Sequence, residues 1–65
     1  MEKLTDREMT ILKLFMQGYA NSEISKKVFI SVHTVKAHIG SITRKLSAKN
    51  RTHAVYLALK NNLIN

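Results

Sequence analysis

Hydrophobic residues recur at helical spacing in four segments of the chain, and no alternating run is long enough to predict a strand. The longest stripe lies in "SVHTVKAHIGSITRKL" (31–46), where Val35, Ile39, Ile42 and Leu46 fall at i, i+4, i+7 and i+11. Ser31 precedes this stripe and is a favourable N-cap residue. The pattern therefore predicts a helix over 32–46 with one buried face and one outward face.

The first predicted helix begins in "LTDREMTILKLFMQGY" (4–19). Thr5 and Glu8 have the spacing of a capping box, and we expect Arg7 and Glu8 to serve capping and internal ion pairs. Gly18 is the expected end, because glycine adopts the left-handed conformation after a helix without strain. The residues expected to face the core are Ile11, Leu12, Phe15 and Met16.

Two shorter helices complete the pattern. "NSEISKKVF" predicts a helix of about two turns, with Asn21 as its N-cap and Glu23 in its first turn. Only Phe29 to Ser31 separate this helix from the next one. The last helix is predicted over 50–63, with Asn50 or a neighbour as its cap.

The last predicted helix is apolar nearly all round at 54–59, so we expect one of its faces to meet a second protein. Its core side is expected to comprise Ala54, Val55 and Ala58. Thr52, Tyr56 and Leu59 share another face at i, i+4 and i+7. We predict that this second face forms a two-fold homodimer contact, which is weak in the protein alone because the patch is small.

Together these elements predict an all-α fold, a compact single domain of four helices over 1–65. A chain of 65 residues can bury one modest core. The absence of cysteine excludes a disulfide scaffold and a thiolate metal site. No apolar run reaches the roughly 18 residues of a membrane span, and no signal peptide opens the chain, so a cytoplasmic protein is expected.

Charge is distributed unevenly along the chain. Residues 1–23 hold all four acidic residues and three basic ones, a net charge of −1, whereas 24–65 hold eight basic and no acidic residues, a net charge of +8. A segment of one sign repels itself unless an anionic partner approaches it. Nucleic acid is the commonest partner of this kind, and an anionic membrane surface is the second.

The short connection between the two central helices shows which anionic partner to expect. A short helix, a tight turn and a longer helix with a basic, small-residue outer face form the layout of a helix-turn-helix that binds duplex DNA. A major groove about 12 Å wide admits one helix whose outer residues are neither bulky nor acidic. The outer face of 32–46 meets this requirement with His33, Lys36, Ala37, Gly40, Ser41 and Arg44.

The chain resembles the LuxR/FixJ/NarL-type helix-turn-helix domain over about Leu4 to Ile64. The shared marks are L-T-x-R-E near the start, N-x-E-I, I-S-x-x-T-V-K-x-H, then K-L and N-R-T-x-A, in this order. The resemblance implies a four-helix domain that binds promoter DNA as a dimer. Such domains usually stand at the C-terminus of a bacterial response regulator or ligand-sensing regulator, and RNA polymerase is a candidate further partner.

The resemblance also implies roles for single residues. Lys36 and Ala37 match positions that family members use in the major groove. His33 and Ser41 are further groove candidates because they lie on the same outer face. Arg44 is expected at a phosphate or a base because of its charge on this outer face, apart from the resemblance. The remaining positions that match residues near phosphates are Asn21, Thr34, His38 and Lys45. Gly40 departs from the pattern, because many members have lysine, serine or another hydrogen-bonding residue there.

Other functions are weighed against this one. A region-4-like domain of a sigma factor shares the T-V-K pattern, but "NRTHAVYLAL" after the recognition helix favours the LuxR type. A basic helical module that binds an anionic membrane or a protein partner is the other alternative. His33, His38 and His53 lack the clustered ligands of a metal site, and no motif predicts catalysis. We therefore expect no enzyme activity and no cofactor.

Overall fold

The computed structural model describes residues 3–61, which contain four helices and no strand. The helices are α1 (Asp6–Met16), α2 (Asn21–Val28), α3 (Val32–Lys45) and α4 (Arg51–Lys60). The predicted all-α class is confirmed. The predicted helix over 32–46 ends one residue earlier than expected, with Leu46 as its C-cap. Positions 62 and 63 of the last predicted helix lie outside the described residues.

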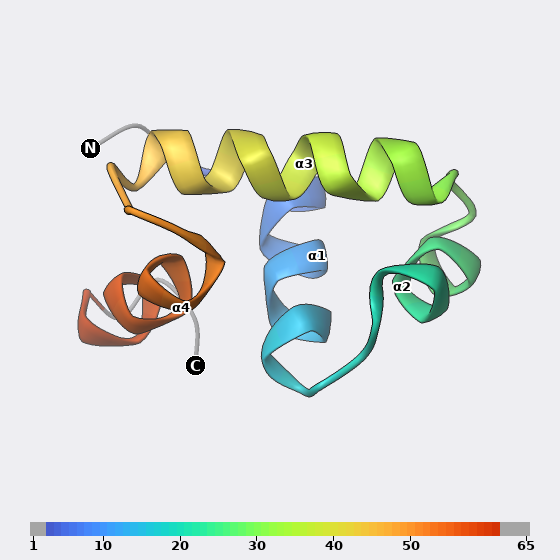
Figure 1. Cartoon of the computed structure of the whole chain (residues 1–65), viewed down its shortest axis with the longest axis horizontal. Helices are drawn as coiled ribbons and strands as arrows, with labels where there is room; N and C mark the ends of the chain where they lie inside the picture. The colour runs from blue at the N-terminus through green and yellow to red at the C-terminus, as the bar shows by residue number, and fades with distance from the viewer. Residues whose placement is uncertain (1–2, 62–65) are drawn as a thin grey trace.

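The longest helix, α3, organises the fold because it packs against each of the other three helices. Figure 1 shows α3 along the long axis, with α2 near one of its ends, α4 near the other and α1 between them. α1 also packs against α2. Both helices of the helix-turn-helix, α2 and α3, are therefore supported by α1.

A single hydrophobic core joins the four helices. The predicted stripe of α3 is buried in full, and it meets Ile11 and Leu12 of α1, Ile24 of α2 and two alanines of α4. Phe15 and Met16 pack against this core in partly buried positions. The expected core of α4 is confirmed for Ala54 and Ala58, which are buried, and Val55 packs against the core without being fully buried.

Local hydrogen bonds at the helix starts explain where three of the helices begin. The capping box of α1 is present, since the Glu8 N–H donates to the Thr5 hydroxyl and the Thr5 N–H donates to the Glu8 carboxylate. The predicted caps Ser31 and Asn50 each accept a backbone N–H in the first turn of their helix. At α4 the backbone N–H of Lys49 also donates to Nδ1 of His53.

The predicted cap of α2 is wrong. Asn21 is the first helical residue, and Ala20, with an extended backbone, is the N-cap. Alanine has no side-chain acceptor, so no cap bond of the usual kind forms. The Glu23 carboxylate instead accepts the Ala20 N–H at 2.9 Å, which satisfies one of the free donors at the helix start. Ala20 and Glu23 therefore have the spacing of a capping box, but only the hydrogen bond to the glutamate side chain is present.

Three helices end in a left-handed residue. Gly18 (φ 95°) follows α1, where the N–H groups of Gly18 and Tyr19 donate to the carbonyls of Phe15 and Leu14. This pair of bonds is the Schellman motif and confirms the predicted stop. The other two left-handed residues, Phe29 (φ 59°) after α2 and Ser47 (φ 55°) after α3, carry side chains.

None of the helices within 3–61 has the length and hydropathy needed to cross a membrane.

Candidate nucleic-acid interface

The outward face of α3 is an exposed stripe opposite the core. It comprises His33, Lys36, Ala37, Gly40 and Arg44, and we refer to these five residues as the recognition stripe. It carries three basic side chains, those of His33, Lys36 and Arg44, and no acidic one. The structure therefore brings four of the five expected groove residues together on the surface, and Ser41 is the exception.

The start of α3 is fixed by its cap. The Thr34 N–H donates to the Ser31 hydroxyl at 3.0 Å, and the two hydroxyl groups lie 2.9 Å apart. The expected role of Thr34 near phosphate thus coexists with a role in the cap. Because a helix start carries a partial positive charge and free N–H groups, this end of α3 is suited to a phosphate.

The small residues of the stripe leave no bulky side chain over the middle of the helix face. A methyl group added at Gly40 would meet nothing within 4 Å, so nothing in the fold requires glycine there. Glycine inside a helix costs about 1 kcal/mol relative to alanine. Ala37 beside it is exposed as well. These two positions present the helix backbone closely to whatever binds the stripe.

Four half-buried residues form one flank of α3, between the core and the recognition stripe. They are Thr34, His38, Ser41 and Lys45, spaced at i, i+4, i+7 and i+11. Ser41, which was expected in the groove, lies here. So do three of the residues expected near phosphates. This flank, and not the stripe, faces α1 at Ser41 and Lys45.

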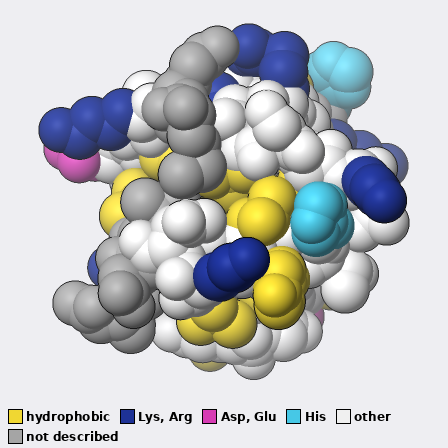
Figure 2. Space-filling model, turned by 90° about the vertical axis from the view of Figure 1, so that its left-hand side faces the viewer, with side chains coloured by type: hydrophobic (Ala, Val, Ile, Leu, Met, Phe, Trp, Pro, Cys, Tyr) yellow, Lys and Arg dark blue, Asp and Glu magenta, His cyan; other side chains and the backbone are white. Residues whose placement is uncertain are grey.

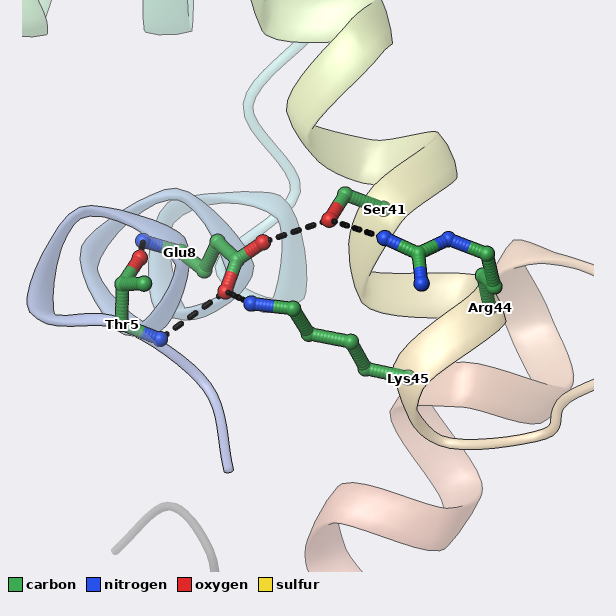
Figure 3. A network of polar contacts seen from close by, with 5 residues as sticks. All are labelled: Thr5, Glu8, Ser41, Arg44 and Lys45. Atoms are coloured by element: carbon green, nitrogen blue, oxygen red, sulfur yellow. Dashed lines mark hydrogen bonds and ion pairs between the residues drawn. The ribbon is translucent and has the colours of Figure 1, made fainter. Parts of the chain in front are cut away.

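The carboxylate of Glu8 joins α1 to this flank (Figure 3). The Ser41 hydroxyl donates to its Oε2 at 2.7 Å, and the Lys45 ammonium lies 2.7 Å from its Oε1. The same Oε1 accepts the Thr5 N–H at 2.9 Å. Glu8 is only 3% exposed, so both oxygens are satisfied inside the protein. The expected capping and ion-pair role of Glu8 is confirmed.

The pKa of Glu8 reflects this environment. Burial alone would raise the pKa, because it disfavours the charged carboxylate. The donors Lys45, the Thr5 N–H and Ser41 outweigh burial and lower the pKa from 4.5 to about 2. Glu8 is therefore charged at neutral pH, and the Lys45 ammonium is its counter-ion. A phosphate contact by Lys45 would have to be shared with Glu8.

Two arginines lie at the edges of this arrangement. Nη2 of Arg44 is 3.4 Å from the Ser41 hydroxyl oxygen, at the border between stripe and flank (Figure 3). Among residues 3–61, Arg7 has no ion-pair partner of the kind expected from the sequence. Its Nη1 donates instead to the carbonyl of Val28, the last residue of α2, at 2.9 Å. Arg7 and Glu8, which are consecutive on α1, thus contact α2 and α3 respectively.

The expected dimer face lies on α4, at the far end of α3 from the turn. Figure 2 views the molecule from this side, where hydrophobic side chains reach the surface beside basic ones. Tyr56 and Leu59 are 57% and 52% exposed, and Thr52 is exposed next to them. The ring of His53 stacks on Tyr56 with centroids 6.3 Å apart, and the Lys60 ammonium lies 5.9 Å from the Tyr56 ring.

Two other sequence expectations concern isolated residues. Asn21 is half-buried at the start of α2, and its expected phosphate contact stays a prediction. Across residues 3–61, no three His, Cys, Asp or Glu side chains are grouped so that they could hold a metal ion.

The sequence model of one protein family, described as bacterial regulatory proteins of the luxR family, matches residues 2–58. The response regulator protein VraR of Staphylococcus aureus is 48% identical over 63 residues, which cover 97% of this chain and 30% of VraR. VraR of Staphylococcus epidermidis is similar to the same extent. The chain thus spans about a third of the length of these curated relatives.

Two solved structures share the fold. The transcription factor GerE superposes with a TM-score of 0.93 at 31% identity, over 100% of this chain and 97% of GerE. The response regulator ChrA of a heme-sensing two-component system gives a TM-score of 0.90 at 41% identity, over 98% of this chain and 32% of ChrA.

The lowered pKa of Glu8 predicts acid unfolding. Since the folded pKa lies below the unfolded value of 4.5, the charged carboxylate contributes stability above about pH 4.5 and loses it as the pH falls towards 2. The shift corresponds to about 3 kcal/mol at neutral pH. Urea unfolding followed by circular dichroism from pH 7 to pH 2 measures this. Glu8→Gln should remove most of the pH dependence, whereas Asp6→Asn, at an exposed carboxylate, should retain it.

The buried ion pair predicts that two lysines of α3 differ in their effect on stability. Lys45→Met leaves the Glu8 charge buried without its counter-ion and should lower the free energy of unfolding by about 3–5 kcal/mol. Lys36→Met removes the same charge from the exposed stripe and should change it by less than about 0.5 kcal/mol. Thermal and urea unfolding of both variants decide the matter. Equal effects would contradict a structural role for the Lys45 ammonium.

Proposed function

Because this chain belongs to the LuxR family of bacterial regulatory proteins, we propose that it binds double-stranded promoter DNA as the DNA-binding domain of a transcription regulator. The family consists of regulators and is not an enzyme class. Membership also favours this function over the sigma-factor and membrane-module alternatives. The observation that carries the proposal is the recognition stripe. It is an exposed, basic face of α3 with small residues at its middle, and the opposite face of the helix is buried in the core.

In this proposal α3 lies in the major groove with its N-terminal half deepest. Lys36 stands one turn into the helix, and its neighbours Ala37 and Gly40 add no bulk. Its ammonium can therefore reach the O6/N7 edge of a guanine, the commonest specific contact of basic side chains. His33 lies one turn closer to the helix start and can donate to a base edge or a phosphate.

Phosphate contacts supply most of the affinity in this arrangement. The start of α3, Arg44 and the start of α2 at Asn21 are the candidate contacts, and Thr34 and His38 adjoin them on the flank. Lys45 contributes mainly by holding α3 on α1, because its ammonium is paired with Glu8. If a dimer contacts about ten phosphates, log affinity against log salt should have a slope of about −9.

The dimer is proposed to form through Thr52, Tyr56 and Leu59 of α4. Two exposed large side chains make a small apolar patch, well below the area of a stable interface. The free domain is therefore expected to be monomeric or weakly dimeric and to pair on adjacent half-sites of DNA. Any regulatory input from a receiver or sensor domain, and any contact with RNA polymerase, would be added to this basic function.

Direct base recognition predicts a specific loss at Lys36. Lys36→Ala should weaken binding to a duplex selected from a random library by about 1–3 kcal/mol and reduce the preference over a scrambled duplex. Lys13→Ala removes the same charge from an exposed position on α1 and should leave the preference unchanged. Fluorescence anisotropy at two salt concentrations measures both affinities. Equal losses on both duplexes would assign Lys36 to phosphate alone, and no loss on either would contradict α3 as the recognition helix.

The α4 contact predicts a separable defect in cooperativity. Tyr56→Glu places two like charges against each other across a two-fold axis, so it should reduce cooperative occupancy of paired half-sites and leave binding to a single half-site intact. The fold should persist because Tyr56 is largely exposed. Thr10→Glu introduces the same charge on α1 as a control. Gel-shift titration of duplexes with one and two half-sites measures the effect, and full cooperativity in Tyr56→Glu would exclude this face.

A further inference from the structure

Two hydrophobic side chains are exposed where α2 turns into α3. Phe29, between the two helices, is 91% exposed, and Val32, the first residue of α3, is 37% exposed. Their neighbours Val28 and Ile30 pack against the core. Along this turn, Val28 and Ile30 therefore face the core, whereas Phe29 and Val32 face the solvent. It lies at the opposite end of α3 from α4 (Figure 1).

Phe29 has an unfavourable backbone conformation, and its side chain adds little to the packing of the fold. Its backbone is left-handed (φ 59°, ψ 44°), which is strained for a bulky L residue. The ring is almost wholly in solvent, so burial does not offset this strain. A glycine would adopt the same turn without strain, as Gly18 does after α1. An exposed aromatic side chain on a strained backbone points to a role outside the fold.

The surroundings of the two side chains indicate what they touch. Lys26, three residues before Phe29 in the chain, and Lys36, four residues after Val32, are exposed, and no acidic residue follows Glu23 in the chain. The ammonium of Lys27 lies instead over the ring of Tyr19, 4.5 Å from its centroid. Val32 and Lys36 are one turn apart on α3 and so neighbour each other. The occupant of this end is therefore an anion that also offers apolar groups. In the major groove of DNA, the C5-methyl group of thymine is such a group.

We propose that Phe29 and Val32 form an apolar contact with thymine methyl groups, so that this end of α3 selects thymine within the half-site. The inference rests on the proposed DNA binding and adds a specificity element to it. Lys36 would read a hydrogen-bonding edge, and the apolar pair would read a methyl group nearer the helix start. An anionic membrane is a poorer occupant, because the recognition stripe has no continuous apolar face to enter a bilayer.

Replacement of thymine by uracil tests the contact, because it removes one methyl group and keeps every hydrogen-bonding group. In a duplex selected from a random library, each thymine is changed to uracil in turn. Uracil at the contacted position should weaken binding of the unaltered protein about four-fold, which is the equivalent of about 0.8 kcal/mol for one buried methyl group. In Phe29→Asn and Val32→Ala this sensitivity to uracil should be reduced, and in the double variant it should vanish.

Ser47→Asn is the matched control. It introduces the same residue at a second left-handed position, at the other end of α3, and asparagine tolerates that conformation. The control should keep the full sensitivity to uracil. Circular dichroism melting checks that all variants fold. The comparison therefore separates loss of the aromatic ring from any effect of asparagine on a helix end.

The possible results are distinct. Uracil sensitivity that persists in the double variant would place the methyl contact elsewhere, for example at Ala37, and would overturn the inference. Absence of uracil sensitivity at every position would also overturn it, while leaving the proposed function standing. Failure to select any duplex would contradict the proposed function itself. Binding to phosphatidylglycerol vesicles that is lost in the double variant, without any uracil effect, would assign the pair to a membrane surface.

Discussion

The buried carboxylate of Glu8 is the constraint on which the rest of the structure depends. A charge that is almost fully removed from water is tolerated only with a counter-ion and hydrogen bonds to its oxygens. Lys45 and Ser41 provide both from α3, and Thr5 adds a backbone N–H. Because Ser41 and Lys45 are one turn apart, their shared acceptor fixes the rotation of α3 about its own axis. The recognition stripe faces outward as a consequence.

Net stability is not the distinctive contribution of this pair. Buried ion pairs can often be replaced by apolar residues without loss of stability, but a hydrophobic contact does not specify direction in the same way. The arginine before Glu8 adds a second link, from its guanidinium to the carbonyl end of α2. A cation is favourable at that end of a helix. One turn of α1 therefore orients both helices of the helix-turn-helix from behind.

Features set by neighbouring residues could be predicted from the sequence. The helix positions, the stripe of α3 and the caps Thr5, Ser31 and Asn50 all depend on partners within a few residues. Residue type alone favours Asn21 as the cap of α2, whereas the structure has Ala20 there, with its N–H bonded to the Glu23 carboxylate. Ser41 was expected in the groove because its position on the helix allows either side. Its contact with Glu8, 33 residues away, has no local signal.

The charge pattern gives a clue to the other long-range contact of Glu8, its ion pair with Lys45. All acidic residues precede position 24, so any internal partner for a lysine of α3 had to come from the first third of the chain. The local Thr5 N–H donates a hydrogen bond to Oε1 of Glu8 but supplies no counter-ion for the carboxylate charge. Lys45 precedes the buried Leu46 and follows Ser41 by one turn, so it lies where a side chain can reach inward. The position of a basic residue relative to the buried stripe thus separates a lysine that holds the helix from one that is exposed and proposed to contact DNA. By this criterion Lys45 belongs to the scaffold and Lys36 to the surface.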